Sequence, residues 1–314
     1  MSSPLLSDDQ IAAFRTIFTK IAVRGTAYGI SVILVGLSAY ILLGQGVRGS
    51  KSRSILLAVL LLMFLCSTGI FVANMVYSLA MIPTVGQEDI VPSPIVLKSY
   101  YALTIFSRIN YSLSDSVVVW RAFILFQRRS LCRVILVLSL LVCWAGALID
   151  CIFALVIGVT GGVLSPNRML VLLLPMLFTN FLATLFIGWR TWYYHQFEHV
   201  KGSLVGENIK RALLLLVESG FAYCIILVLC IISLYPGTLS RTGAGILAGL
   251  FPHISAIYPT LIIILMSIQK ISTLPGETVL SRSLQLSEAM MSSDQSETSS
   301  SPVVPGFRVQ KEIA

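Results

Sequence analysis

Hydrophobic residues in this chain gather in long uninterrupted stretches separated by short polar segments. Seven stretches hold about 20 mostly apolar residues, the length that an α-helix needs to cross the hydrocarbon core of a bilayer. They fall at roughly 26–43, 55–82, 97–126, 134–159, 169–189, 212–235 and 246–268. None alternates apolar and polar residues as a membrane β-strand does. The pattern therefore predicts an all-α membrane protein, a seven-transmembrane helix bundle.

The segments outside this bundle, which spans 26–268, are more polar. Residues 1–25 predict a short extracellular N-terminal segment, in which Ile11 to Arg24 could extend the first span as an interfacial helix. We expect no removable signal peptide, because these residues lack an apolar core and a small-residue cleavage site. Residues 269–314 are rich in Ser and Thr and predict a disordered tail with candidate phosphorylation sites.

Composition supports a lipid environment. Hydrophobic residues make up 56% of the chain and charged residues 11%, and the mean hydropathy is +0.88. A soluble domain carries about 25% charged residues, so a water-soluble fold is excluded. The net charge of +8 could favour nucleic acid as a partner. However, the basic residues lie at helix ends and form no contiguous stripe, so we expect the lipid bilayer and no nucleic acid.

The basic residues predict the orientation of the bundle. Most of the 22 Lys and Arg residues lie in the first, third and fifth loops and in the tail. Because basic loops stay in the cytoplasm, we expect the N-terminus outside and the C-terminus in the cytoplasm. The plasma membrane is the expected location. The outer loops are short apart from about 83–96, so a small or lipid-like ligand suits them better than a large protein.

The six cysteines all lie in spans or in a cytoplasmic loop, so we expect apolar packing residues and no extracellular disulfide. They are Cys66, Cys132, Cys143, Cys151, Cys224 and Cys230.

Four polar residues of the spans fall in the outer half of the membrane when depth is counted from the basic helix ends at about 1.5 Å per residue. Arg108 and Asp150 lie at similar depth on consecutive spans, so an ion pair between them is feasible. Asn74 and His253 belong to the same layer. Ionisable residues inside a membrane are costly and mark functional sites, so we expect these four to line a ligand-binding pocket.

A second group falls in the inner half. Asp115 and Glu218 lie near the cytoplasmic ends of their spans. Arg121 could reach either carboxylate by snorkelling, and Tyr258 completes this inner polar lock or switch. The alternative is that these residues only hold helices together. Prolines in the fifth and seventh spans, namely Pro175, Pro252 and Pro259, are places where a bundle can bend.

Three stretches carry a resemblance to a known group of proteins: Ser112-Leu-Ser-Asp-Ser-Val-Val-Val-Trp-Arg-Ala122, Leu213-Leu-Leu-Leu-Val-Glu-Ser-Gly220 and Ile257-Tyr-Pro-Thr260. With them the chain resembles uncharacterised seven-helix proteins of mushroom-forming basidiomycete fungi, which look like G-protein-coupled receptors. The resemblance covers all seven spans and implies a receptor-like function, with a heterotrimeric G protein as the candidate partner. It implies no particular ligand. Trp120-Arg121 stands where rhodopsin-like receptors have an acid-Arg-aromatic triplet.

Other functions were weighed against a receptor. A secondary transporter of a small solute would line its path with the same charges, although spans one to three and five to seven show no matching repeat. A retinal pump needs a lysine in the last span, and 246–268 has none. The H-x-x-E-H pattern His195–His199 could hold zinc, but a solvated helical extension explains it better. We therefore expect no enzyme activity, no catalytic residues, no metal and no cofactor.

Overall fold

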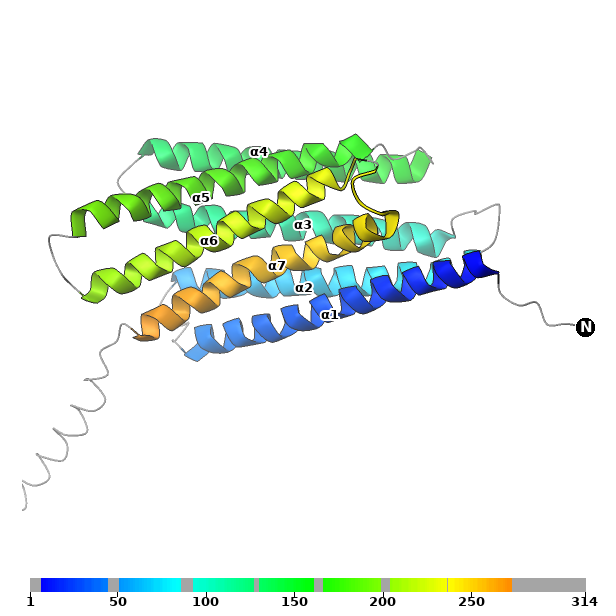
Figure 1. Ribbon diagram of the computed structural model, residues 1–314, viewed down its shortest axis with the longest axis horizontal. Coiled ribbons are helices and arrows are strands. Elements are labelled where there is room, and N and C mark those ends of the chain that lie inside the picture. The colour runs from blue at the N-terminus through cyan, green and yellow to red at the C-terminus, as the bar shows by residue number, and fades with distance from the viewer. Residues whose placement is uncertain are drawn as a thin grey trace, which may run out of the picture. The chain divides into compact units, whose positions relative to one another are not determined.

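The computed structural model describes residues 7–44, 51–85, 93–126, 130–160, 166–198, 204–235 and 237–272. These residues are almost entirely helical, and each predicted span falls on one long helix (Figure 1). Helix α1 begins well before its span, α5 ends later than its span and α6 begins earlier than its span. In chain order the helices are α1 (Asp8–Gly44), α2 (Lys51–Met81), the short 3-10 helix η2 (Ile82–Thr84), α3 (Pro94–Leu125), α4 (Ser130–Thr160), the 3-10 helix η3 (Pro166–Met169), α5 (Leu170–Glu198), α6 (Leu204–Ile232) and α7 (Arg241–Ser272).

The chain divides into two compact units, Met1–Gln269 and Lys270–Ala314. The first unit contains the bundle, and only the last residues of α7 are described in the second. Within the first unit each helix from α1 to α5 packs on the helix that follows it. Short connections make such neighbours antiparallel. We call the end at which α1, α3, α5 and α7 begin the N-side end of the bundle, and the opposite end the C-side end.

The first helix begins well before the first predicted span. Residues 8–25, assigned by sequence to an N-terminal segment in which Ile11 to Arg24 could extend the first span, are helical and continuous with the rest of α1. A capping box fixes the start of this helix: Ser7 N–H donates to Gln10 Oε1 at 3.2 Å, and Gln10 N–H donates to Ser7 Oγ at 3.3 Å. This reciprocal pair satisfies backbone groups that have no partner at a helix start. As a result Arg24 lies inside a helix rather than in a tail.

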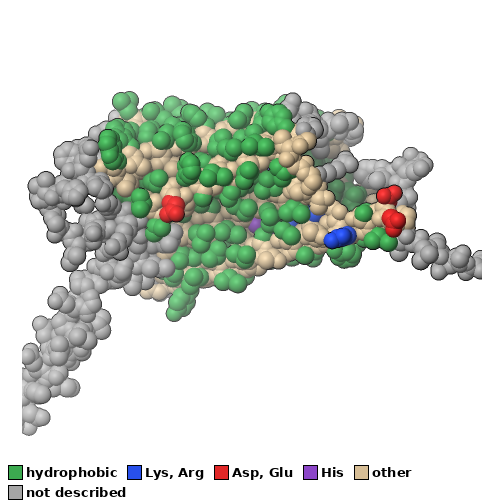
Figure 2. Space-filling model, viewed as in Figure 1, with side chains coloured by type: hydrophobic (Ala, Val, Ile, Leu, Met, Phe, Trp, Pro, Cys, Tyr) green, Lys and Arg blue, Asp and Glu red, His purple; other side chains and the backbone are tan. Residues whose placement is uncertain are grey.

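Large apolar side chains cover the outside of the bundle (Figure 2). Six of the seven helices are long and apolar enough to cross a bilayer. A water-soluble bundle would present polar residues on these faces, whereas lipid is the solvent that such a surface requires. The fold is therefore that of a helical, integral membrane protein.

Helix α3 is the exception in composition because it lies inside the bundle. It packs against α2, α4 and α5, and it is more polar than the other six helices. Its buried polar residues are Ser99, Thr104, Ser107, Asn110, Ser112, Ser114 and Asp115. Because neighbouring helices shield this face from lipid, its polar groups can be satisfied within the protein.

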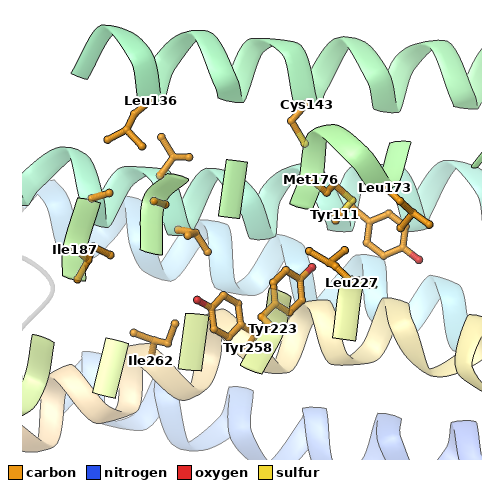
Figure 3. Packing of buried hydrophobic residues seen from close by; sticks show 14 of the residues in the cluster. Tyr111, Leu136, Cys143, Leu173, Met176, Ile187, Tyr223, Leu227, Tyr258 and Ile262 are labelled. Atoms are coloured by element: carbon orange, nitrogen blue, oxygen red, sulfur yellow. The ribbon is translucent and has the colours of Figure 1, made fainter. Parts of the chain in front are cut away.

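The main apolar core lies between α3, α4, α5, α6 and α7 (Figure 3). Tyr223 of α6 and Tyr258 of α7 stack face to face there, with ring centroids 4.7 Å apart. Two smaller clusters join α7 to α1 and α2, through Ile263, and to α2 and α3, through Ala256. Helix α7 therefore contributes to every part of the core.

Small residues bring helices close together. A Cβ atom added at Gly146 of α4 would lie 2.6 Å from the carbonyl oxygen of Val171, and one at Gly220 of α6 would overlap the Thr184 side chain of α5. Close backbone approach replaces the hydrophobic effect as a source of helix association in lipid.

Candidate functional site: a cationic cavity at the N-side end

A cavity of about 240 Å³ lies between the helices near the N-side end. Every helix except α4 contributes to its wall. The lining residues are Arg24 from α1, Asn74 from α2, Tyr100, Leu103, Thr104, Ser107, Arg108 and Tyr111 from α3, Arg168 and Met169 from η3, Leu172 and Leu173 from α5, Cys230 from α6, Ser233 and Leu234 just after it, and Ala248, Gly249, Phe251 and Pro252 from α7. The lining combines cationic and polar side chains with apolar and aromatic ones.

Asp150 holds two of the three arginines. The Arg108 guanidinium contacts Asp150 twice: Nη2 lies 2.5 Å from Oδ2, and Nε donates to the same oxygen at 2.7 Å. On the other side, Arg168 Nε lies 3.3 Å from Asp150 Oδ1. The Asp150 side chain is fully buried, and those of Arg108 and Arg168 are only 14% and 9% exposed. The ion pair predicted between Arg108 and Asp150 is therefore present, and it has a third member.

The third arginine has a neutral partner. Arg24 Nη1 donates to Asn74 Oδ1 at 2.8 Å, and the Asn74 amide is oriented by its own bond to the Ile70 carbonyl at 3.0 Å. Gly249 of α7 makes room for the Arg24 guanidinium, because a Cβ at that position would overlap it.

Positive charge exceeds negative charge at this cavity. Three guanidinium groups line it, and no acidic residue is among the described residues that do. Asp150 lies behind the wall with both oxygens directed at arginines. Arg24 Nε and Arg168 Nη1 are buried and have no hydrogen-bond partner among the described residues. Buried charge without a full set of partners is unfavourable, so this wall is chemically incomplete.

His253, the fourth residue predicted for the pocket, lies beside it rather than in its wall. The imidazole is fully buried, and its Nδ1 is 3.2 Å from Ser67 Oγ of α2. The Tyr28 ring of α1 packs edge-on against it. His253 therefore connects α1, α2 and α7 directly after Pro252, which does line the cavity.

A second polar cluster lies in the centre of the bundle around Asp115. This carboxylate is fully buried. Asn180 Nδ2 of α5 donates to Oδ1 at 2.8 Å, and the Cys143 thiol of α4 donates to Oδ2 at 2.9 Å. Asp115 thus joins α3, α4 and α5 through neutral donors, in keeping with the structural alternative for this residue.

The inner lock differs from the expected one. Arg121 Nη2 donates to the Pro259 carbonyl of α7 at 2.9 Å, and no ion pair joins it to either acid among the described residues. Glu218 is exposed on α6, because it lies on the side opposite the buried Leu216 and Gly220. Tyr258 stacks on Tyr223 in the core. In place of the expected salt bridge, the Arg121 guanidinium therefore donates to a backbone carbonyl of α7.

Helix α3 holds α7 at both of its prolines. In addition to Arg121 at Pro259, Asn110 Nδ2 donates to the Pro252 carbonyl at 2.8 Å. Asn110 and Arg121 are 11 residues apart, which is close to three helical turns, so both lie on one face of α3. Since Pro252 lines the cavity, this pair of bonds connects the cavity wall with the part of the core nearer the C-side end.

Sequence reasoning did not place Arg24 or Arg168 in the pocket. It counted Arg24 as a charge of the N-terminal segment, at the end of the extension expected over Ile11 to Arg24, and Arg168 as a charge of the fourth loop. The Ser7–Gln10 capping box was the available signal for Arg24, since it extends α1 through that position. For Arg168 only its position directly before the predicted fifth span gave an indication. Folding of η3 toward Asp150 could not be deduced from spacing.

The structure also places the cysteines and the H-x-x-E-H segment. All six cysteines are free, and five of them are buried. The H-x-x-E-H segment falls at the end of α5, where His199 and the side chains from residue 193 onward lie outside the described residues. Within the part of the chain that the structure describes, no three His, Cys, Asp or Glu side chains group together as metal ligands would.

Comparisons with protein-family models, with curated proteins and with solved structures give no match for this chain. Function must therefore be argued from the site itself.

Proposed function

We propose that this protein is a receptor-like membrane protein that crosses the bilayer seven times, with its N-terminus outside. A small or lipid-like ligand occupies the N-side cavity and changes the packing of the bundle, and a cytoplasmic partner reads this change at the C-side end. The observation that supports this proposal most strongly is the cavity. Six α-helices line it, and its lining includes buried arginines with incomplete hydrogen bonding.

Support for a seventh span comes from the position of α3. The helix extends over 32 residues, which is enough for a bilayer crossing at 1.5 Å per residue. Its polar residues are buried against other helices rather than exposed to lipid. The same argument favours an odd number of crossings and hence termini on opposite sides.

Signal transfer needs an element with two packings that the ligand can bias. Helix α7 suits this role because it contributes Phe251 and Pro252 to the cavity and carries a second proline near the C-side end. Asn110 and Arg121 fasten it to α3 at these two points. A ligand that displaces Phe251 therefore moves α7 relative to α3 and alters the hydrogen bonds that Asn110 and Arg121 make to it. A heterotrimeric G protein is the candidate partner, in line with the receptor-like resemblance of the sequence.

A reconstitution experiment tests this function. The protein is inserted into nanodiscs with a heterotrimeric G protein, and nucleotide exchange is followed while small anionic, neutral and cationic amphiphiles are added. We expect at least one compound to change the exchange rate. Sealed vesicles containing the same protein serve as the parallel assay, and no compound should cross them faster than it crosses protein-free vesicles. Solute flux with unchanged nucleotide exchange would reject the receptor and favour a secondary transporter.

A further inference from the structure

We propose that the N-side cavity is an anion site, which selects a small amphiphile by a carboxylate or phosphate group held between Arg24, Arg108 and Arg168. This inference rests on the proposed function and deepens it by naming the chemical class of the ligand.

The charge of the wall selects an anion over a cation. A cationic ligand would need a carboxylate in the wall, but Asp150 does not line the cavity. Although Asp150 Oδ1 accepts no hydrogen bond among the described residues, the carboxylate already forms ion pairs with Arg108 and Arg168. An anion instead meets guanidinium groups that have donors to spare. The Arg168 side chain is 9% exposed, lines the cavity and keeps Nη1 without a partner. Arg24 Nε is also buried without a hydrogen-bond partner among the described residues.

Guanidinium geometry suits carboxylate and phosphate in particular. Its planar fork can donate two parallel hydrogen bonds to a pair of oxygens, and such charge-assisted bonds are stronger than neutral ones. The hydroxyl groups of Thr104, Ser107 and Ser233 line the same cavity and offer further donors. An anion would also complete the partners that the buried arginines lack, so its binding offsets part of their desolvation cost.

The remainder of the wall selects an apolar tail. Leu103, Leu172, Leu173 and Phe251 line the same cavity as the cations. The volume of about 240 Å³ lies below the range of roughly 300–1,000 Å³ that is usual for drug-sized ligands. The ligand is therefore a short-chain amphiphile, or the headgroup end of a longer lipid.

Four probes with the same chain separate charge from hydrophobicity: octanoate, octyl phosphate, octanol and octyltrimethylammonium. Binding is measured by titration calorimetry on the full-length protein in nanodiscs of neutral phosphatidylcholine, with empty nanodiscs as the blank for partitioning. We expect octanoate or octyl phosphate to bind at least roughly tenfold more tightly than octanol, because charge-assisted hydrogen bonds are stronger than neutral ones. Octyltrimethylammonium should not bind above the blank. Equal affinity for octanoate, octyl phosphate and octanol, or preferred binding of the cation, would overturn the proposal.

Variants locate the site. Arg168→Gln should lower the affinity for octanoate or octyl phosphate by roughly tenfold and leave the affinity for octanol unchanged. Arg168→Lys should retain part of the affinity for the anion. Arg133→Gln removes the same charge near the opposite end of the bundle, where the guanidinium packs over the Phe123 ring, and should have no effect. Thermal unfolding of each variant verifies that it is folded. If a folded Arg168→Gln variant binds the anion as the wild type does, the arginine wall is not the site.

The anion could come from the aqueous phase or from a lipid headgroup. Nanodiscs containing phosphatidic acid distinguish these sources: competition with octanoate identifies a bilayer phospholipid, and unchanged octanoate affinity identifies a separate small amphiphile. Both outcomes preserve the anion selectivity. Because calorimetry needs no G protein, anion binding without nucleotide exchange would reject the receptor function alone.

Discussion

Asp150 is the residue on which the geometry of the cavity wall depends. Its two oxygens contact two guanidinium groups, and all three side chains are buried or nearly so. In a buried ion network the attraction between partners offsets a large desolvation cost, so removal of one partner leaves the others uncompensated. The cost of a substitution here is therefore much larger than at an exposed acid.

We expect Asp150→Asn to lower the free energy of unfolding by about 3–5 kcal/mol, the range for breaking a buried pair. The measurement is thermal or denaturant unfolding in detergent. Glu218→Gln is the matched control, because it removes an exposed carboxylate from α6, and it should change stability by less than about 0.5 kcal/mol. The double variant Arg108→Gln/Asp150→Asn should lose less than the sum of the single losses, since the two residues interact directly. Additive losses would contradict the coupling of this pair.

At the scale of the elements, contacts between helices depend on small residues and on side-chain bonds to backbone carbonyls. Gly220 lets α6 approach Thr184 of α5, and Arg121 and Asn110 hold α7 to α3. In lipid there is little hydrophobic gain from helix association, so these local features determine which helices stay together.

Gly220→Leu should separate α5 from α6 and lower the free energy of unfolding by about 1–3 kcal/mol, as overpacking does. Gly36→Leu on α1 is the control, because a Cβ there meets nothing within 4 Å. The comparison of unfolding midpoints for the two variants measures the effect. Equal midpoints would show that α6 does not rely on close approach.

Loss of the Arg121 bond should loosen the end of α7. We expect Arg121→Gln to increase deuterium uptake in the α7 peptide that follows Pro259, because its link to α3 is weakened. Hydrogen exchange with mass spectrometry on the protein in nanodiscs measures this uptake. Arg133→Gln removes an arginine that contacts the Phe123 ring instead and should leave α7 unchanged. Unaltered deuterium uptake in Arg121→Gln would show that the hydrogen bond from Arg121 to the Pro259 carbonyl does not stabilise this end of α7.

At the scale of the whole molecule, the number of crossings is the property that distinguishes the alternatives. Six of the described helices meet the length and apolarity of a span, whereas α3 has the length but is not among the apolar candidates. Six crossings put both termini on one side of the membrane, whereas seven put them on opposite sides.

A tag at each terminus therefore tests the topology. We expect an N-terminal tag to stain on intact cells and a C-terminal tag to stain only after permeabilisation, because the basic loops belong in the cytoplasm. Staining of both termini on the same side would require α3, or another helix, not to cross. An N-terminal tag that needs permeabilisation would invert the assignment of the N-side cavity to the outer face.

Some of the site could be predicted from helical geometry alone. Counting depth along rigid helices brought Arg108 and Asp150 to the same layer, and the structure pairs them. The same count placed Asp115 beside Arg121, but depth does not specify the direction in which a side chain points. Asp115 instead bonds to Asn180 and Cys143. The exposure of Glu218 could have been deduced from its phase relative to Leu216 and Gly220, which share the buried face of α6.

The sequence alone determined that this is a helical membrane protein and where its helices lie, because the transfer of some 20 apolar residues into lipid is a local property that needs no partner. Only the tertiary structure decided that Arg24 and Arg168 meet Arg108 around one cavity. Their positions depend on a capped extension of α1, on the fold of η3 and on the single glycine that admits Arg24 against α7. Such convergence joins residues that are up to 144 positions apart, and no local pattern encodes it.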